Sequence, residues 1–203
     1  MHNIRLLNET MDEKSINQSI LPWIEAAGNP YYDWLFQDPA TTTFFMKLWI
    51  RNRQSEIFIA RIQALFIDDQ IAGGLIALNG EDLFKCRKAD TKYLIIKTNL
   101  EQRKEMILRL SSSEGLFPTV SEDEYYLSKI GINPSFRGKR YGSLLMDKYL
   151  EQGAKSGLNK YRLDVFAENQ IAIKCYEKYG FKIDKETTTK NGELKYFSMT
   201  YKE

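Results

Sequence analysis

An alternation of strand and helix patterns over residues 125–179 limits the folds open to this chain more than any other feature. Residues 125–132 and 161–166 predict strands, whereas residues 142–156 and 170–179 predict helices. Two strands that are joined through a helix in this way lie parallel in one sheet, with a right-handed crossover. We therefore expect an α/β (α+β) fold in which a parallel pair of strands belongs to a larger sheet.

The other strand patterns predict antiparallel hairpins, so the central sheet should be mixed. These strands are expected over residues 4–7, 58–67, 71–78, 181–186 and 194–201. Gly73 and Gly74 interrupt one of them, which indicates a bulge or a close approach of another backbone. Asn191-Gly192 lies between the last two strands and is typical of a tight primed turn.

The length of the chain favours a single domain over residues 1–203. With 43% hydrophobic residues it can bury one substantial core, and it is short for two. Within this domain we expect an N-terminal aromatic-rich helical extension over residues 1–55, a helical insertion over residues 80–124 and the functional core over residues 125–186. The aromatic residues of the extension either pack as core or line a pocket; they are Tyr31, Tyr32, Trp34, Phe36, Phe44, Phe45 and Trp49.

The charge balance excludes partners that need a strong global field. The chain has 29 Lys and Arg residues against 27 Asp and Glu residues, a net charge of +2, so neither nucleic acid nor an anionic membrane is expected as a partner. No segment approaches the run of about 20 apolar residues in a spanning helix, and no signal-peptide core is visible, so we expect a cytoplasmic protein. Two cysteines and one histidine cannot build a Cys/His zinc site, so no metal is expected.

A basic loop containing glycines follows the first of the two parallel strands. It consists of Arg137, Gly138, Lys139, Arg140, Tyr141, Gly142 and Ser143, and the next helix begins inside it. Three cations at a helix N-terminus oppose the helix dipole unless an anion binds there. Free amides at such a helix start form a phosphate site, although a solvated basic turn fits the composition equally well. The Walker and dinucleotide-binding glycine patterns are absent, which disfavours ordinary ATP and dinucleotide binders.

The segment from Arg137 to Gly142 resembles the Arg/Gln-x-x-Gly-x-Gly/Ala signature of the GNAT superfamily of acyl-CoA N-acyltransferases. The resemblance implies a GNAT-like sheet whose parallel strands splay apart at a CoA cleft. It also implies that backbone amides of the loop hold the CoA pyrophosphate. Arg140 stands where the family has its first glycine. That departure is acceptable if Arg140 has a negative φ, because the group offered to the phosphate is its backbone N–H.

The strand before the loop carries a glycine, Gly131, in its interior. By the resemblance, Ile130, Gly131 and Ile132 hold the pantetheine arm of CoA, and one of their N–H groups faces the thioester oxygen. The residues alone fit an ordinary bulged core strand as well.

The helix after the second parallel strand extends the resemblance. Asn169, Ala172, Tyr176 and Gly180-Phe181 match the spacing of the second CoA motif of the family. The match implies that Asn169 contacts pantetheine and that Tyr176 protonates the departing CoA thiolate. Without the resemblance, Asn169 is a good helix N-cap and Tyr176 a core aromatic.

Together these features predict an N-acetyltransferase that moves an acetyl group from acetyl-CoA to a primary amine by direct attack in a ternary complex. Tyr176 is the expected general acid. Glu124 is the candidate base, because strict alternation along the strand places it on the face of Ser128 and Ile130; a solvated carboxylate is the alternative. Cys175 is expected in the core rather than as a nucleophile.

The acceptor and the assembly stay open at this point. A small-molecule amine or a peptide could accept the acetyl group, and a protein N-terminal or lysine acetyltransferase would use the same motifs. A non-catalytic acyl-CoA sensor would keep the basic loop but could dispense with Tyr176. The N-terminal extension and the insertion are expected to cap the acceptor side of the cleft, and a homodimer is one possible assembly.

Overall fold

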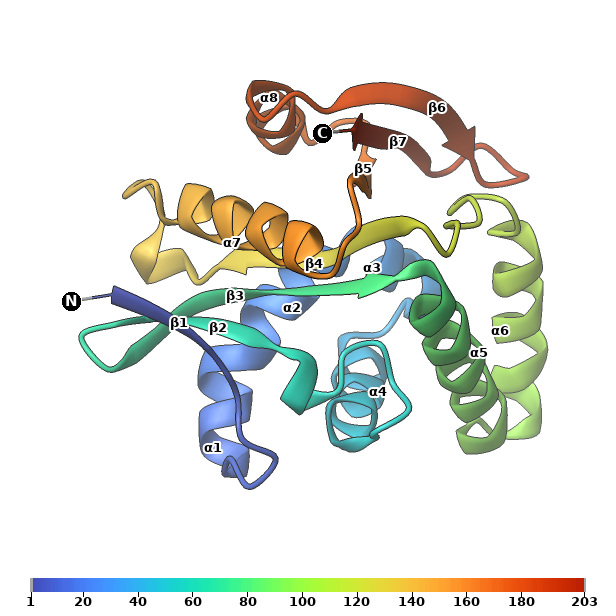
Figure 1. Ribbon diagram of the computed structural model, residues 1–203. Coiled ribbons are helices and arrows are strands. Elements are labelled where there is room, and N and C mark those ends of the chain that lie inside the picture. The colour runs from blue at the N-terminus through green and yellow to red at the C-terminus, as the bar shows by residue number, and fades with distance from the viewer. Residues whose placement is uncertain (1, 203) are drawn as a thin grey trace.

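The computed structural model describes residues 2–202, which build one mixed sheet with helices on both of its faces (Figure 1). The strands are β1 (His2–Leu6), β2 (Gln63–Ile67), β3 (Gln70–Asn79), β4 (Glu124–Ile132), β5 (Lys160–Phe166), β6 (Lys182–Thr188) and β7 (Lys195–Lys202). Their order across the sheet is β1-β2-β3-β4-β5-β7-β6. β4 and β5 run parallel, while the other paired strands that the structure describes run antiparallel. The predicted mixed fold with a parallel pair inside the sheet is confirmed.

The helices divide between the two faces and one end of the sheet (Figure 1). They are α1 (Glu13–Ser15), α2 (Leu21–Gly28), α3 (Tyr31–Phe36), α4 (Pro39–Arg51), α5 (Gly80–Lys97), α6 (Leu100–Ser112), α7 (Tyr141–Lys155) and α8 (Gln170–Lys178). η1 (Ile16–Ile20) is a short π-helix, and η2 (Ile59–Arg61) and η3 (Pro134–Phe136) are 3₁₀ helices. α1 to α4 lie on one face, α7 crosses the opposite face between β4 and β5, and α5 and α6 stand at the end where β3 finishes.

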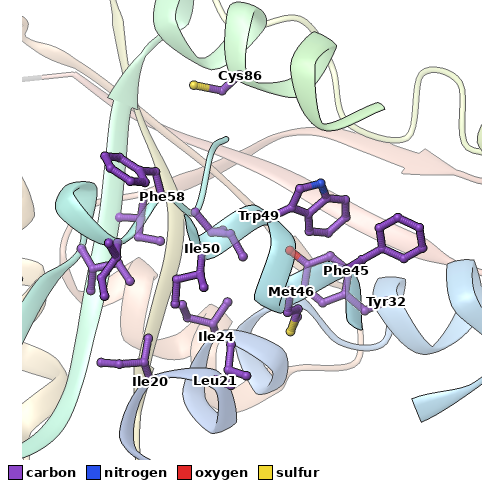
Figure 2. Close-up of a cluster of buried hydrophobic side chains, with 14 of the residues drawn as sticks. Ile20, Leu21, Ile24, Tyr32, Phe45, Met46, Trp49, Ile50, Phe58 and Cys86 are labelled. Carbon is purple, nitrogen blue, oxygen red and sulfur yellow. The ribbon is translucent and has the colours of Figure 1, made fainter. Parts of the chain in front are cut away.

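Alternate residues of the strands feed two hydrophobic cores, one on each face of the sheet. On β2, Ala64 and Phe66 belong to the core under α2 and α4, whereas Leu65 belongs to the core under α7. In the first core the side chains of Ile24 from α2 and Ile50 from α4 are both fully or almost fully buried and lie close together (Figure 2). Burial of each such side chain contributes about 1.5–3 kcal/mol. This packing fixes α2 against the sheet, where it becomes one wall of the site described below.

The glycine pair of β3, Gly73 and Gly74, lies at the bulge and at the close backbone contact that the sequence predicted. The β2–β3 register shifts so that Leu65 pairs with Gly73 and Phe66 with Ile71, which leaves an extra residue on β3. A Cβ on Gly73 would also lie 2.2 Å from the carbonyl oxygen of Gly131. Both readings, a bulge and a close approach of backbone, are therefore confirmed.

Two local expectations are wrong for tertiary reasons. The strand predicted over residues 58–67 begins only at Gln63, because the apolar residues before it are buried by tight turns such as the Arg61 N–H donating to Phe58 O at 2.8 Å. The last hairpin has no two-residue turn: the Thr189 N–H donates to Leu194 O at 3.0 Å around a four-residue loop. Lys190 in that loop donates its N–H to Ser112 O of α6 at 2.9 Å, so contacts outside the hairpin shape the loop.

Candidate active site

The central feature of the site is the point at which β4 and β5 separate. The two strands pair in parallel from Glu124 opposite Lys160 as far as Leu127 opposite Leu163, and both continue for several residues beyond that point. The space between their ends is a cleft, which α2 and α8 also line. Its lining from β4 consists of Leu127, Ser128, Ile130, Gly131 and Ile132. The edge of β4 that faces β5 is therefore open to a ligand, and the expected splay of the strands is confirmed.

A bulge in β4 lies at the mouth of this separation. Ile76 of β3 pairs with Lys129 and Ala77 pairs with Leu127, so Ser128 is the extra residue. Ser128 and Lys129 consequently both reach the carboxylate of Glu56, although they are neighbours in the chain. The role predicted for Glu124 assumed that the side chains of β4 alternate regularly between the two faces of the sheet. The bulge at Ser128 interrupts that alternation, so Glu124 and Ile130 need not share a face.

Gly131 allows α2 to lie close to β4. A Cβ on Gly131 would approach the Trp23 carbonyl oxygen at 3.0 Å and the Trp23 ring at 3.2 Å. Trp23 is fully buried and lines the cleft together with Gly131. Ile130, Gly131 and Ile132, the residues predicted to hold pantetheine, thus all line the cleft between β4 and α2.

The start of α7 differs from the starts of the other long helices on the surface. Arg140 precedes α7 with a φ of 61°, so the negative φ that would have made the departure from the motif acceptable is not present. A left-handed conformation costs a non-glycine residue about 1–2 kcal/mol, and a glycine would adopt it freely. No side chain caps α7, whereas α4, α5, α6 and α8 are capped by Asp38, Asn79, Asn99 and Asn169. The Ser143 N–H donates to Arg140 O at 3.1 Å, so the amides of Tyr141 and Gly142 are the ones that α7 can offer to an anion.

The basic loop forms an open cradle beside the cleft. Arg137 lines the cleft, and its Nε donates to Ile132 O at 3.0 Å. The described residues Gly138 to Ser143 lie outside the cleft lining, in the loop and the first turn of α7: Gly138, Lys139 and Arg140 are exposed, and Tyr141, Gly142 and Ser143 are half-buried. Nothing lies within 4 Å of a Cβ built on Gly138 or Gly142. Space for a phosphate group is therefore present at the predicted position.

α8 contributes two predicted residues to the same cleft. The Ala172 N–H donates to Asn169 Oδ1 at 3.2 Å, which confirms Asn169 as the N-cap, and Asn169 also lines the cleft. Tyr176 lines the cleft with its ring against Phe181, at 6.3 Å between centroids. Within residues 2–202 the Tyr176 hydroxyl has no hydrogen-bond partner. Burial raises the pKa of Tyr176 well above its usual value, so the hydroxyl stays protonated at neutral pH.

Glu124 and Cys175 lie outside this constellation. The Glu124 carboxylate, at the far end of β4, accepts the Ser121 N–H at 2.7 Å and lies 3.5 Å from Nη1 of the buried Arg162. It lines neither the cleft nor the neighbouring pocket. Cys175 is half-buried on α8, and burial raises the pKa of its thiol, which disfavours the reactive thiolate.

A second pocket of about 200 Å³ adjoins the cleft and shares Ala27, Ser128, Asp164 and Tyr196 with it. Residues from the N-terminal extension and from the segment 80–124 both line it. Its aromatic lining consists of Tyr31, Tyr32, Trp49, Phe117, Tyr126 and Tyr196, and its charged lining of Glu56, Arg87, Asp90, Lys129 and Asp164. Three of the aromatic residues that the sequence singled out therefore face this pocket, while Phe36 and Phe45 pack in the core.

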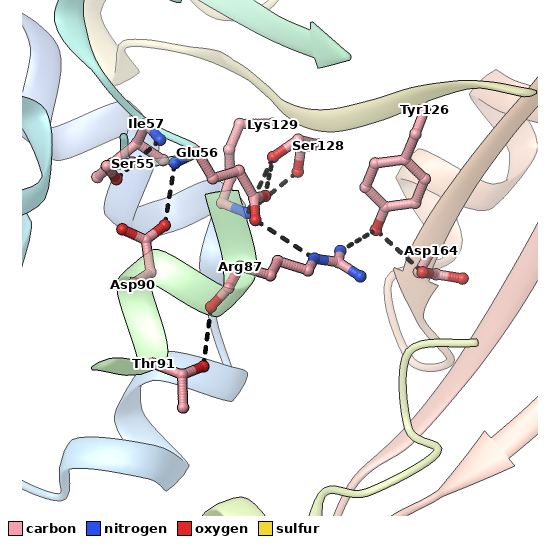
Figure 3. Close-up of polar contacts among 10 residues, drawn as sticks. All are labelled: Ser55, Glu56, Ile57, Arg87, Asp90, Thr91, Tyr126, Ser128, Lys129 and Asp164. Carbon is pink, nitrogen blue, oxygen red and sulfur yellow. Dashed lines mark hydrogen bonds and ion pairs between the residues drawn. The ribbon is translucent and has the colours of Figure 1, made fainter. Parts of the chain in front are cut away.

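Glu56 is the centre of a polar network in this pocket (Figure 3). Its carboxylate accepts hydrogen bonds from Ser128 Oγ and from Lys129 Nζ, the latter at 3.4 Å, and from Arg87 Nε at 3.3 Å. Burial alone would raise the pKa of Glu56, but the cations of Lys129 and Arg87 outweigh it and lower the pKa to about 2. Arg87 Nη2 also donates to the Tyr126 hydroxyl at 3.0 Å. The network holds an ionised carboxylate between two cations.

Two further carboxylates in the pocket keep an oxygen without a partner. Asp90 Oδ2 accepts the Glu56 N–H at 2.9 Å and Asp164 Oδ2 accepts the Tyr126 hydroxyl at 2.9 Å. The Oδ1 atoms of both are buried and make no hydrogen bond of ordinary geometry within the described part of the chain, although Ser55 lies close enough to Asp90, and Ser198 to Asp164, to lower the pKa of each carboxyl. Burial raises the pKa of Asp90 to about 7, and burial raises that of Asp164 against opposing effects of Ser198 and Arg87. Asp164 belongs to both the pocket and the cleft, so it marks their junction.

Sequence reasoning missed these charged residues. Asp164 carried a usable signal, because aspartate is depleted in strands and Asp164 stands between the apolar residues Leu163 and Val165 of β5. Glu56, Arg87 and Asp90 carried none, since each looks like an ordinary charged residue of a loop or a helix.

Residues 2–202 contain neither a membrane-spanning helix nor a cluster of metal-binding side chains. No helix there is long and apolar enough to cross a membrane. No group of three or more His, Cys, Asp or Glu side chains there could hold a metal ion.

Solved structures of acetyltransferases share this fold. An N-acetyltransferase from Staphylococcus aureus Mu50 matches with a TM-score of 0.69 at 18% identity, over 98% of this chain and 100% of that one. The PaiA N-acetyltransferase from Thermoplasma acidophilum, solved in complex with coenzyme A, matches with a TM-score of 0.58 at 13% identity, over 100% of this chain and 99% of that one. At these identities the likeness concerns the fold.

Similarity in sequence identifies the family to which the chain belongs. The uncharacterized N-acetyltransferase YycN from Bacillus subtilis (strain 168) is 38% identical over 65 residues, which cover 32% of this chain and 41% of that protein. The match thus spans less than half of the relative. A sequence model of the acetyltransferase (GNAT) family matches residues 21–181, from α2 through the cleft to the end of α8. The chain therefore belongs to the GNAT acetyltransferase family.

Proposed function

We propose that this protein is an acetyl-CoA-dependent N-acetyltransferase that acetylates a primary amine of a small molecule. The observation that carries the proposal is the position of Asp164, which lines both the cleft between β4 and β5 and the pocket beside it. A donor bound in the cleft and an acceptor bound in the pocket would meet at this residue. Direct transfer in a ternary complex needs such a junction.

The groups in and beside the cleft fit CoA. The uncapped start of α7 and the loop from Arg137 to Ser143 offer amides and cations to a pyrophosphate. The open edge of β4 at Ile130, Gly131 and Ile132 offers backbone groups to an extended arm with amide bonds. When bound, acetyl-CoA supplies a thioester, and an N–H of this edge would stabilise negative charge on its oxygen. Removal of one such donor costs about 3 kcal/mol in other enzymes.

Two side chains would move the protons. An amine reaches the site mostly as an ammonium ion and must lose a proton before it can attack. The unpaired Oδ1 of Asp164 is the acceptor for that proton, and its raised pKa suits the task. The Tyr176 hydroxyl donates a proton to the leaving sulfur, and its raised pKa keeps it protonated until then. Glu124 is less suitable as the base because Arg162 and the Ser121 amide occupy its carboxylate.

Two alternatives are supported less well. A non-catalytic CoA sensor would not require a second pocket with an unpaired carboxylate at the junction. A protein acetyltransferase needs an open groove for a peptide, whereas the pocket of about 200 Å³ lies below the usual range of ligand pockets, about 300–1,000 Å³. A small acceptor, or a single side chain, fits this volume.

Two measurements test the proposal. Isothermal titration calorimetry should detect CoA binding, and thiol release from acetyl-CoA should depend on an added primary amine. CoA binding without amine-dependent thiol release, across a broad panel of small amines and peptides, would favour the sensor. Absence of CoA binding would overturn the proposal outright.

A further inference from the structure

We propose that the acceptor is a free α-amino acid with an apolar side chain, whose ammonium group lies at Asp164 and whose carboxylate lies at Nη1 of Arg87. This inference rests on the proposed function, because it names the acceptor class for the same site. It is drawn from a guanidinium group that lines the pocket beside Asp164 and keeps hydrogen-bonding capacity for a ligand.

The guanidinium group of Arg87 is only partly engaged by the protein. Its Nε donates to Glu56 Oε2 at 3.3 Å, and its Nη2 donates to the Tyr126 hydroxyl at 3.0 Å (Figure 3). Within residues 2–202 the structure shows no partner for Nη1, and 32% of the Arg87 side-chain surface is exposed. Nη1 carries two N–H groups and arginine keeps its charge at any working pH. It can therefore donate charge-assisted hydrogen bonds to an anionic group of a ligand.

The ion pairs around Glu56 contain more cations than carboxylates. Arg87 and Lys129 both pair with Glu56, and they lower its pKa to about 2, so one ionised carboxylate faces two cations. Lys129 Nζ lies within 3.5 Å of Glu56 Oε1, Ser128 O and Ser128 Oγ, which matches its three donor hydrogens. Asp90 balances the second cation only in part, because burial raises its pKa to about 7. A ligand carboxylate at Arg87 would complete the balance.

The spacing of the two recognition groups is short, because one oxygen atom bridges them. The Tyr126 hydroxyl accepts from Arg87 Nη2 at 3.0 Å and donates to Asp164 Oδ2 at 2.9 Å (Figure 3). An α-amino acid carries its ammonium nitrogen and its carboxylate on the same carbon atom, so it can reach a cation and a carboxylate that lie this close together. A peptide N-terminus would present a neutral amide to Arg87 instead, and a simple amine would present nothing.

The remaining walls of the pocket suit an apolar side chain. Its hydrophobic lining includes Tyr31, Tyr32, Leu35, Trp49, Ile57 and Phe117. Burial of an apolar side chain against such a lining is favourable, whereas a charged side chain would lose its hydration there. The volume of about 200 Å³ limits the ligand to a small molecule. Asp164 also lines the cleft, so the ammonium group is the end of the ligand beside the thioester.

The ammonium nitrogen loses two protons during the transfer. One passes to Asp164, and from there to solvent, before the nitrogen attacks the acetyl carbon. The carbon–nitrogen bond forms, the carbon–sulfur bond breaks, and Tyr176 gives its proton to the departing sulfur. The second proton of the nitrogen restores the Tyr176 hydroxyl. The products are an N-acetyl amino acid and the thiol of CoA.

Calorimetry with three matched probes, with and without saturating CoA, tests the inference without relying on turnover. L-Leucine, L-leucinamide and isoamylamine share the amine and the branched side chain. Leucinamide has a neutral amide in place of the carboxylate, and isoamylamine lacks the group altogether. We expect L-leucine to bind the wild-type protein at least about 10-fold more tightly than either of the others.

Two variants locate the effect. Arg87→Gln should raise the Kd of L-leucine at least about 10-fold and that of isoamylamine by less than about 3-fold. Lys88→Gln removes the same formal charge at an exposed position of α5 outside the pocket lining, and it should change neither Kd. An equal loss of both ligands in Arg87→Gln would overturn the role of Arg87 as the carboxylate site. If Arg87→Gln does not fold, the comparison of the three probes on the wild-type protein still decides.

The failure of this inference and that of the proposed function can be told apart. L-Leucine that binds no more tightly than isoamylamine would overturn the amino-acid assignment, and so would tighter binding of L-leucinamide, which would favour a peptide N-terminus. Thiol release from acetyl-CoA with isoamylamine as efficient as with L-leucine would overturn the assignment and leave the proposed function intact. Tight L-leucine binding without thiol release would overturn the proposed function and leave the pocket as an amino-acid site.

Discussion

The cleft and the pocket beside it differ in the kind of hydrogen-bonding group that they leave unpaired. The cleft and its adjoining loop offer donors: the uncapped start of α7, the open edge of β4, the cations of the loop and the Tyr176 hydroxyl. The pocket offers acceptors, the Oδ1 atoms of Asp90 and Asp164, while Lys129 and Arg87 both donate to Glu56 and Arg87 Nη1 stays free within residues 2–202. The first arrangement suits an anionic acyl carrier and the second a cationic amine. Two neighbouring sites of opposite character can therefore hold two substrates without competing for either.

Tyr176→Phe tests whether the Tyr176 hydroxyl in the cleft supplies the proton to the leaving sulfur. It has the largest expected effect. The variant removes one hydroxyl without a protein partner, so packing against Phe181 should persist. We expect kcat to fall by about 10²–10⁴-fold, with the Kd of CoA and of the amine within a few-fold of wild type. Steady-state thiol release and calorimetry measure these quantities. Tyr201→Phe removes a hydroxyl outside the cleft lining and serves as the control. Unchanged kcat would leave Tyr176 as a packing residue.

Asp164→Asn tests the junction between the two sites. Asparagine keeps an oxygen for the Tyr126 hydroxyl but cannot accept a proton from the amine. We expect kcat/KM to fall by about 10²-fold at neutral pH and to recover partly at alkaline pH, where more of the amine is already neutral. A pH–rate profile of both proteins measures this. The same loss at every pH would indicate a structural role for Asp164 instead.

Gly142→Leu tests the donor character of the cradle without touching the pocket. A Cβ at Gly142 would have nothing within 4 Å, so the fold should tolerate leucine, whereas a phosphate group at the start of α7 would be displaced. We expect the Kd of CoA to rise at least about 10-fold, and the Kd of an accepted small primary amine to stay within about 2-fold. Thermal unfolding of the free variant is the control for folding. Unaltered CoA affinity would place the pyrophosphate elsewhere.

The pH dependence of stability is a separate test, which belongs to the pocket. The folded-state pKa of Asp90 is raised from 3.8 to about 7, so the folded protein retains a proton that the unfolded chain releases. The contribution of Asp90 to stability is complete below about pH 4 and is lost as pH rises to about 7, by at most about 1.4 kcal/mol per pH unit. Asp90 faces Glu56 and Lys129, and Glu56 stays ionised across this window. Urea unfolding should therefore show a shallower decline for Asp90→Asn than for the wild type, and parallel curves would contradict the buried state of Asp90.

The cleft could be predicted from the sequence and the pocket could not, because the residues of the cleft lie close together along the chain whereas those of the pocket lie far apart. Most of the predicted cleft residues lie between Ile130 and Tyr176, on two strands and two helices that follow one another, so spacing and order carry their arrangement. The charged residues of the pocket come from a loop, from α5 and from two strands, and only tertiary packing brings Glu56 and Asp90 together. The same limit explains the errors in the fold. Local patterns predicted nearly all strands, but contacts with α6 set the shape of the last loop.

Arg140 and Asp164 both depart from the conformational preferences of their residue types, and the two departures teach different things. Arg140 takes a left-handed conformation that arginine disfavours and glycine adopts freely, so the loop keeps a backbone shape typical of the glycine that the family motif has at this position. Asp164 lies in the strand β5 although aspartate is disfavoured in strands. That conflict was visible in the sequence and could have identified Asp164 as a site residue.

The bulge at Ser128 has a consequence for the rate at which CoA would bind. A bulge bends its strand and increases the local twist, so the backbone itself holds the end of β4 away from β5. The entrance for the pantetheine arm is then preformed, and no lid has to open and no strand pair has to break before the ligand enters. We therefore expect stopped-flow association to follow one exponential whose rate constant rises linearly with CoA concentration, without the plateau that a preceding conformational step would impose.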